Sequence, residues 1–254
     1  MIKRLLPWLF VLVAGPVMAA GAGPVLLQSG ANISDQASLQ RGAQLYFNYC
    51  GSCHSLQYVR YSRLAKDLGL TEKQVMDNLN FTGGKIGDTI KAAMPAGLGP
   101  DAVGAEDWFG KAPPDLSLIA RARLGGADYT YTYLMSFYVD PTRPSGWNNT
   151  VFPNASMPHV LWERQGIQTL RPAEEHAEGG EGHAAGPTFD LVKPGSRTPE
   201  QYRQDARDIT AFLKYVGEPA ALDREKYGIW VILYLLLFTG VAYLLKHEYW
   251  KDVH

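Results

Sequence analysis

The residues with the clearest chemical potential form the pentapeptide Cys50-Gly51-Ser52-Cys53-His54. It contains both cysteines of the 254-residue chain, three positions apart, and a histidine directly after the second. Two thiols one helical turn apart can form thioethers with the two vinyl groups of haem, and the next imidazole can then bind the iron as proximal ligand. The motif predicts one covalently attached haem c, with Cys50 and Cys53 as attachment sites and His54 as an iron ligand.

Three other interpretations of a C-x-x-C motif leave its histidine without a role. A zinc site needs four ligands and usually a second pair of cysteines or histidines at tight spacing, which the sequence lacks. A thioredoxin-like redox pair is expected in a βαβ context, which the sequence pattern does not show. A structural disulfide across three residues would close almost no loop and would stabilise the fold little.

A second strong ligand would make the iron six-coordinate, closed to small molecules and suited to one-electron transfer. An open position would instead indicate a haem enzyme or a gas sensor. A methionine thioether is the expected sixth ligand of a high-potential carrier. Met76 and Met135 fall in segments where core packing is the better explanation. Met94 and Met157 both lie in expected loops and both precede proline, so spacing leaves either as the ligand.

Several helices must position this motif. Leu39, Ala43 and Tyr46 recur at helical spacing directly before Cys50, so a helix is expected to lead into the motif. Capping signals and stop residues place further helices at residues 72–79, 115–124 and 199–216. Long stretches rich in Gly, Pro and Asn separate these segments, and no strand-rich pattern competes. The expected fold is therefore mainly α, with long loops.

Both ends of the chain have the properties of membrane-related segments. Lys3 and Arg4 precede an apolar run at residues 5–14, and small residues follow at a typical cleavage position, which predicts a signal peptide at residues 1–19. Residues 228–245 carry no charge and as a helix reach roughly 27 Å, enough to cross a bilayer core. The predicted organisation is a signal peptide (1–19), an exported haem domain (20–223) and a transmembrane anchor with a short cytoplasmic tail (224–254).

Composition narrows the classes of partner. A formal net charge of −1, with 46% hydrophobic and 19% charged residues, excludes the strongly basic character of nucleic-acid-binding proteins. The exported part carries 18 basic and 22 acidic residues, so its mildly acidic surface is expected to steer a basic partner. The Gly/Ala-rich stretch 174–187 is predicted to be a solvated loop. Its two histidines have no fixed geometry, so no metal site is expected there.

Five segments together resemble the cytochrome c1 family, the haem subunits of the quinol:cytochrome c oxidoreductase, or cytochrome bc1 complex. They are RGAQLYFNYCGSCHSLQYVRY, APPDLSLIARARLGGADYTY, VFPNASMPHVLWE, DITAFLKYVGEP and the C-terminal membrane span. The resemblance runs from about residue 39 to the end of the chain. It implies a class I cytochrome c-like haem domain, in which Gly42 and Tyr46 face the late helix at residues 209–213.

The resemblance also implies roles for individual residues. It makes Met157 the sixth iron ligand and leaves the other loop methionine without a role. Arg121 would pair with a haem propionate, where a guanidinium can bind a carboxylate bidentately, whereas Arg123 would be a solvated surface residue. A backbone carbonyl of the Pro113-Pro114 turn would accept a hydrogen bond from the proximal histidine and so orient its ring.

The implied function is electron transfer. By this resemblance the chain takes electrons from the Rieske iron–sulfur subunit and passes them to cytochrome c, with cytochrome b as a further partner in a dimeric complex. It would not be catalytic alone. The implied location is the bacterial inner membrane, with a single span and the haem domain on the periplasmic side. A tethered shuttle serving an oxidase would share all the haem chemistry, while a two-haem peroxidase would need a second C-x-x-C-H motif.

Overall fold

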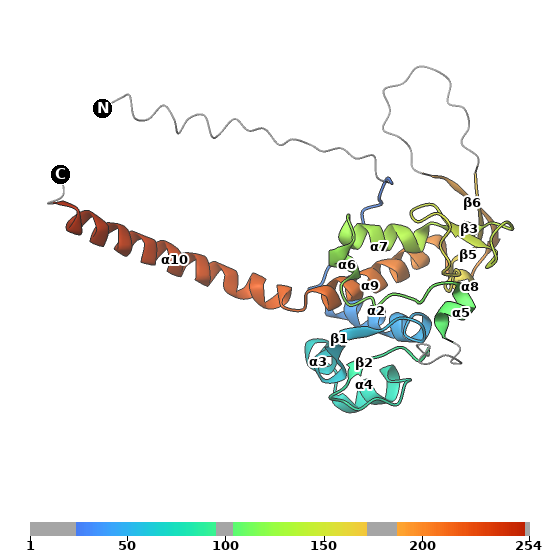
Figure 1. Ribbon diagram of the computed structural model, residues 1–254, viewed down its shortest axis with the longest axis horizontal. Helices are drawn as coiled ribbons and strands as arrows, with labels where there is room; N and C mark the ends of the chain where they lie inside the picture. Colours follow the sequence, from blue (N-terminus) through green and yellow to red (C-terminus); the bar gives the residue numbers. More distant parts are fainter. Residues whose placement is uncertain (1–23, 95–103, 172–186, 252–254) are drawn as a thin grey trace, which may run out of the picture.

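The computed structural model describes residues 24–94, 104–171 and 187–251. Within these ranges, helices and short two-stranded sheets form a domain from which one long helix extends (Figure 1). The mainly α fold class is thus confirmed. The predicted signal peptide (1–19) and all but the last residue of the predicted loop (174–187) lie outside the described residues.

The helices and strands occur in mixed order along the chain. The helices are α2 (Gln36–Tyr49), α3 (Tyr61–Asp67), α4 (Glu72–Leu79), α5 (Ala105–Phe109), α6 (Ile119–Ala122), α7 (Gly126–Met135), α8 (Trp162–Gln165), α9 (Pro199–Gly217) and α10 (Ala221–Tyr249). The strands are β1 (Leu56–Arg60), β2 (Thr89–Ile90), β3 (Phe137–Val139), β4 (Trp147–Asn149), β5 (Gly166–Leu170) and β6 (Phe189–Pro194). The helices predicted before Cys50, at 72–79 and at 199–216 are confirmed as α2, α4 and α9.

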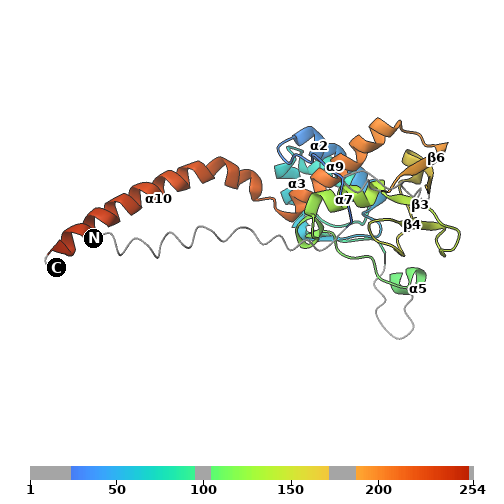
Figure 2. The same ribbon diagram turned by 90° about the horizontal axis from the view of Figure 1, so that it is seen from above.

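The centre of the core is the crossing of α2 and α9, which lie side by side in Figures 1 and 2. A Cβ atom on Gly42 would overlap the backbone carbonyl of Asp208 and lie 2.8 Å from Cβ of Phe212. Tyr46, one turn further along α2, is fully buried, and its ring centroid is 5.5 Å from that of Phe212. The predicted contact of Gly42 and Tyr46 with the late helix is therefore confirmed.

A buried carboxylate joins the same two helices through polar contacts. Asp208 of α9 is 1% exposed and accepts hydrogen bonds from the Ser38 hydroxyl at 2.5 Å and from Nε of Arg41 at 2.7 Å. Gln204 donates to the same carboxylate at 2.8 Å. Because a buried carboxylate is costly unless its oxygens are paired, the donors Ser38 and Arg41 fix the register of α2 on α9.

The helix predicted at residues 115–124 is shorter than expected, since only α6 is helical there. The Asp115 carboxylate instead accepts hydrogen bonds from the backbone N–H groups of Gln57 and Ser117, at 2.9 and 2.8 Å. Leu116 N–H donates to the Ser55 carbonyl at 2.9 Å. The hydrogen bonds of Asp115 and Leu116 thus run to residues 55 and 57 and within the turn at 115–117, and the helix begins only at Ile119.

The sequence pattern did not predict the strands or the helices α3, α5, α7 and α8. Helix α7 packs on α9, and its buried residues include alternating threonines and tyrosines. The three strand pairs β1–β2, β3–β4 and β5–β6 are separate antiparallel two-stranded sheets. They occur where only loops were expected, but each is short enough that the domain remains mainly helical.

The segment before α2 contacts both α7 and α9. Ser29 donates through both its N–H and its hydroxyl to the Asp128 carboxylate of α7, at 2.8 and 2.7 Å. From α9, Arg207 donates to the Ser29 carbonyl at 2.9 Å and Lys214 to the Ala31 carbonyl at 3.0 Å. This segment therefore ties α7 to α9.

Helix α10 leaves the domain and extends away from it (Figure 2). Its segment Lys226–Tyr249 is long and apolar enough to cross a membrane, and none of its most apolar window is buried. A helix that is apolar on all sides and has no protein cover is typical of a membrane span. The predicted span at residues 228–245 lies inside α10.

We expect Gly42→Ala to destabilise the protein, because the added methyl group would collide with the α9 backbone. Overpacking of this kind lowers the free energy of unfolding by about 1–3 kcal/mol. In a domain of this size, a loss of about 2 kcal/mol lowers the melting temperature by roughly 4–8 °C. Thermal unfolding of the purified chain in detergent measures the effect. Gly87→Ala is the control, because a Cβ there meets no atom within 4 Å. Equal melting temperatures for both variants would contradict the tight crossing.

Candidate haem-binding site

The cysteine motif forms one tight turn at the end of α2. The N–H groups of Cys53 and His54 donate to the Cys50 carbonyl at 3.0 and 2.8 Å. Cys50 is buried and Cys53 half-buried, and both are free thiols. Burial raises the pKa of Cys50 to about 12, so this thiol stays protonated at neutral pH. The turn thus holds two thiols that form no disulfide next to an imidazole.

The ring of His54 has a fixed tautomer. Its Nδ1 lies 2.8 Å from the carbonyl oxygen of Pro114, which can only accept a hydrogen bond. Nδ1 must therefore carry the hydrogen, and Nε2 carries the lone pair. Burial lowers the pKa of His54, which is 8% exposed, so the neutral form that binds metals is favoured. The predicted carbonyl partner in the Pro113-Pro114 turn is thus present in the structure.

A role of Tyr46 was missed by the sequence analysis, which assigned it to packing alone. Its hydroxyl donates a hydrogen bond to the backbone carbonyl of His54 at 2.5 Å. Tyr46 is fully buried, and burial strongly raises its pKa, so the hydroxyl remains a donor. Tyr46 and Pro114 therefore hold the same histidine at its backbone and at its ring.

Met157 lies in the loop between β4 and α8 and is half-buried. Its sulfur accepts a hydrogen bond from the hydroxyl of Tyr133 on α7 at 3.6 Å. Burial raises the pKa of Tyr133, so this hydroxyl also stays protonated. The sequence analysis gave Tyr133 no role, and nothing in its spacing pointed to the methionine loop.

The other three methionines of the described chain have different surroundings. Met76 and Met135 pack against the hydrophobic core, as predicted. Met94 lies close to the cysteine turn, because its N–H donates to the Ser52 carbonyl at 2.9 Å. The two loop methionines thus differ in their contacts. The Met157 sulfur accepts from a side-chain hydroxyl, whereas Met94 is held through its backbone N–H.

The two arginines near α6 also have different neighbours. Arg121 Nη1 lies 3.8 Å from the Glu218 carboxylate, and its side chain is 58% exposed. The guanidinium of Arg123 lies over the rings of Tyr129 and Phe152, 5.5 and 5.7 Å from their centroids. Arg123 is exposed, as the sequence analysis expected, and its cation also lies near two aromatic faces.

A buried histidine that the sequence analysis did not single out follows Met157 by two positions. His159 is 2% exposed, and its ring stacks on that of Phe137, 4.8 Å between centroids and 7° between planes. The Trp147 ring meets it edge-on at 5.1 Å. Burial lowers the pKa of His159 to about 4, with the side chain of Gln165 acting in the opposite direction. The ring is therefore neutral.

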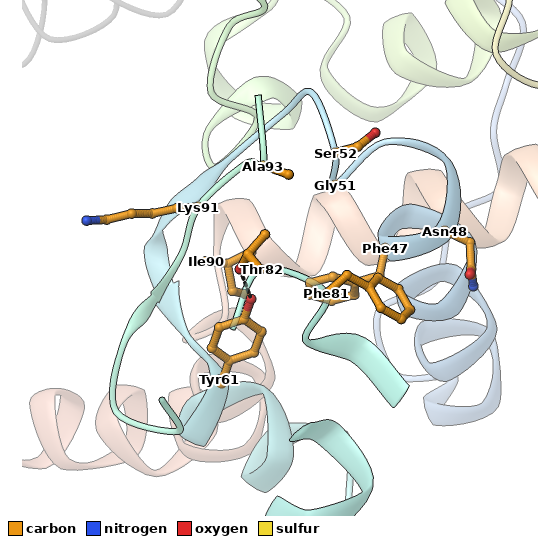
Figure 3. A pocket seen from close by; sticks show the side chains of 10 residues that line it. All are labelled: Phe47, Asn48, Gly51, Ser52, Tyr61, Phe81, Thr82, Ile90, Lys91 and Ala93. Atoms are coloured by element: carbon orange, nitrogen blue, oxygen red, sulfur yellow. Dashed lines mark hydrogen bonds between the residues drawn. The ribbon is translucent and has the colours of Figure 1, made fainter. Parts of the chain in front are cut away.

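A small cavity lies behind the cysteine turn (Figure 3). Its volume is about 270 Å³, below the range of roughly 300–1,000 Å³ that ligand pockets span. Phe47, Phe81 and Ile90 contribute apolar walls, and Tyr61 and Thr82 meet through their hydroxyls at 3.4 Å. We therefore regard it as a packing gap on the side of the turn formed by Gly51 and Ser52.

The donor set fits a haem c. Two thiols share one turn, as attachment to two vinyl groups requires, and the adjacent imidazole has its Nε2 lone pair free. A thioether is available on Met157. In the part of the chain that the structure describes, no group of three His, Cys, Asp or Glu side chains could hold a metal ion, so the zinc alternative gains no support. A bound haem c would supply a one-electron couple.

Comparison with known proteins agrees with this chemistry. Residues 28–253 match the family described as the Cytochrome C1 family. The chain is 48% identical to cytochrome c1 of Allochromatium vinosum, with 99% of both chains covered. It is 43% identical to a protein named ammonia monooxygenase gamma subunit of Nitrosomonas europaea, covering 100% of this chain and 99% of the relative. Cytochrome c1 of Rhodospirillum rubrum is 29% identical, with 94% and 95% covered. This chain belongs to the cytochrome c1 family.

Proposed function

We propose that this chain receives single electrons from the Rieske iron–sulfur protein and passes them to a cytochrome c on the periplasmic side of the bacterial inner membrane. As a member of its family it is a membrane-anchored haem subunit of the cytochrome bc1 complex. The observation that carries the proposal is the His54 ring, held at Nδ1 by Pro114 beside two free thiols. That arrangement suits permanent attachment of one redox group.

The proposed haem c is attached through Cys50 and Cys53 and bound at iron by His54. Met157 is the proposed sixth ligand. A neutral thioether favours the ferrous state, so this ligand pair suits a carrier of high reduction potential. The Tyr133 hydroxyl supports the assignment, because it restrains the sulfur while leaving a second lone pair for a metal. With both axial positions filled, the chain would exchange electrons without binding substrate.

The membrane-spanning helix found among the described residues supports the proposed location. Helix α10 is the C-terminal anchor, and a cleaved leader at residues 1–19 would place the domain ahead of it outside the cytoplasm. The mildly acidic exported part suits a basic electron acceptor through long-range attraction. In the proposed assembly the chain lies beside cytochrome b and the Rieske protein, and the whole complex is a dimer.

Purification through a tag on this chain tests the assembly. We expect cytochrome b and the Rieske protein in the same sample, two copies of each subunit per particle, and a haem that stays on this polypeptide after denaturation. A Cys50→Ser, Cys53→Ser double variant is the control and should lose the covalent haem. Recovery with oxidase subunits would favour a tethered shuttle. Recovery with subunits of an ammonia-oxidising enzyme would favour the assembly named for the Nitrosomonas europaea relative.

Replacing the sulfur ligand tests the role of Met157. We expect Met157→Lys to lower the midpoint potential by on the order of 0.1 V, since axial ligands tune haem potentials over about 0.8 V and an amine stabilises ferric iron better than a thioether. Redox titration of the purified complex measures the shift. Met94→Leu is the matched control and should keep the wild-type potential. A shift in the control alone would move the ligand role to Met94.

The proposed propionate partner is Arg121. Binding a propionate would exchange its long contact with Glu218 for a charge-assisted hydrogen bond. Loss of this positive charge should disfavour the reduced state, so we expect Arg121→Gln to lower the midpoint potential by roughly 10–40 mV, the equivalent of an exposed ion pair. Arg123→Gln is the comparison. If Arg123→Gln shifts the potential and Arg121→Gln does not, the guanidinium over Tyr129 and Phe152 takes the role instead.

A further inference from the structure

The loop that carries Met157 is irregular, and its first half is held by two asparagine amides. The Asn148 side-chain oxygen accepts from the Asn154 N–H at 2.8 Å, and the Asn149 side-chain oxygen accepts from the Val151 N–H at 2.9 Å. Asn154 itself has a φ of 63°, a left-handed conformation that asparagine tolerates. These contacts fix the chain up to Asn154 but end before Met157.

The second half of the loop is held by a ring. In the β3–β4 hairpin Phe137 pairs with Asn149 and Val139 with Trp147, so Phe137 and Trp147 project from the same face. The imidazole of His159 lies against both, parallel to Phe137 and edge-on to Trp147. Stacked and edge-to-face pairs at these separations are attractive and directional. The hairpin therefore provides an aromatic surface on which the His159 ring of the loop packs.

A stiff backbone links the His159 ring to Met157, the proposed ligand. Pro158 stands between Met157 and His159, and its ring fixes its own φ near −65°. The same ring disfavours helical conformations for the residue before it, here Met157. With two adjacent residues restricted in this way, the placement of the His159 ring limits where the Met157 side chain can begin.

The same hairpin residue also contacts the second restraint on Met157. The Phe137 ring meets Tyr133 edge-on at 5.1 Å, and the Tyr133 hydroxyl donates to the Met157 sulfur at 3.6 Å. Phe137 thus contacts both the ring that bonds the sulfur and the ring that anchors the loop two residues later. We propose that His159 is a positioning residue, which holds Met157 in place through the stacking of its ring on Phe137 and Trp147.

This inference rests on the proposed role of Met157 as iron ligand, and it assigns the effect to the ring face of His159. A phenyl ring should therefore replace the imidazole, whereas removal of the ring should free the ligand loop. Ring pairs of the usual strength correspond to about a tenfold change in an equilibrium. The carbon monoxide affinity of the reduced haem would rise with the fraction of time that the Met157 sulfur is not bound to the iron.

Carbon monoxide binding by the reduced, purified complex tests the proposal, together with the midpoint potential. His159→Ala should increase carbon monoxide affinity about tenfold and lower the potential, while His159→Phe should stay within about twofold of wild type. Tyr138→Leu is the matched control, because Tyr138 lies on the same strand, points to the opposite face and pairs with Phe189. It should behave as wild type.

Each other outcome has a definite meaning. If His159→Ala keeps wild-type affinity and potential, or if His159→Phe opens the haem as His159→Ala does, the ring-stacking role is overturned. If His159→Ala does not accumulate, Trp147→Leu removes one ring partner without changing the loop and must raise carbon monoxide affinity. Wild-type behaviour of that variant would also overturn the proposal. Ready binding of carbon monoxide by the wild type would instead refute the ligand role of Met157, which is a separate failure.

Discussion

The hydrogen bond from His54 Nδ1 to the Pro114 carbonyl determines what the cysteine turn can do. A carbonyl offers no proton, so the imidazole must present its other nitrogen, unprotonated, as a ligand. Much of the surrounding structure keeps His54 Nδ1 facing the Pro114 carbonyl. Tyr46 holds the histidine backbone, and the Asp115 carboxylate binds the chain on both sides of the contact. A haem protein needs such a fixed ring, because ring rotation would alter the metal bond.

The sequence predicted those elements whose signals are local. Helices α4 and α9 both begin at a threonine capping box, and the structure contains both reciprocal hydrogen bonds. The 115–124 prediction was too long, and the start of that segment is held by contacts distant in sequence, such as the bond from the Gln57 N–H to the Asp115 carboxylate. Helix α7 was missed because its run of tyrosines and threonines has strand propensity, which packing on α9 overrides. The β3–β4 strands of three residues each are too short for a periodic signal.

In the site, too, only the residues that are adjacent in sequence could be predicted. Cys50, Cys53 and His54 are adjacent in sequence, so their chemistry could be proposed before any fold was known. The surroundings of Met157 could not, because Tyr133, Phe137 and Trp147 come from α7, β3 and β4, and only the folded chain brings them to one loop. Non-local packing also explains Arg123, whose aromatic neighbours are six and 29 positions away.

The crossing of α2 with α9 at Gly42 has a consequence for biosynthesis. About 150 residues separate the end of α2 from the start of α9, so the first helix emerges long before the surface that buries it. Contacts so distant in sequence form late, since a large loop must close first. Until then the pentapeptide at the end of α2 remains on an incompletely folded chain. Its sulfur atoms are accordingly accessible during this time, until Cys50 is buried in the folded core.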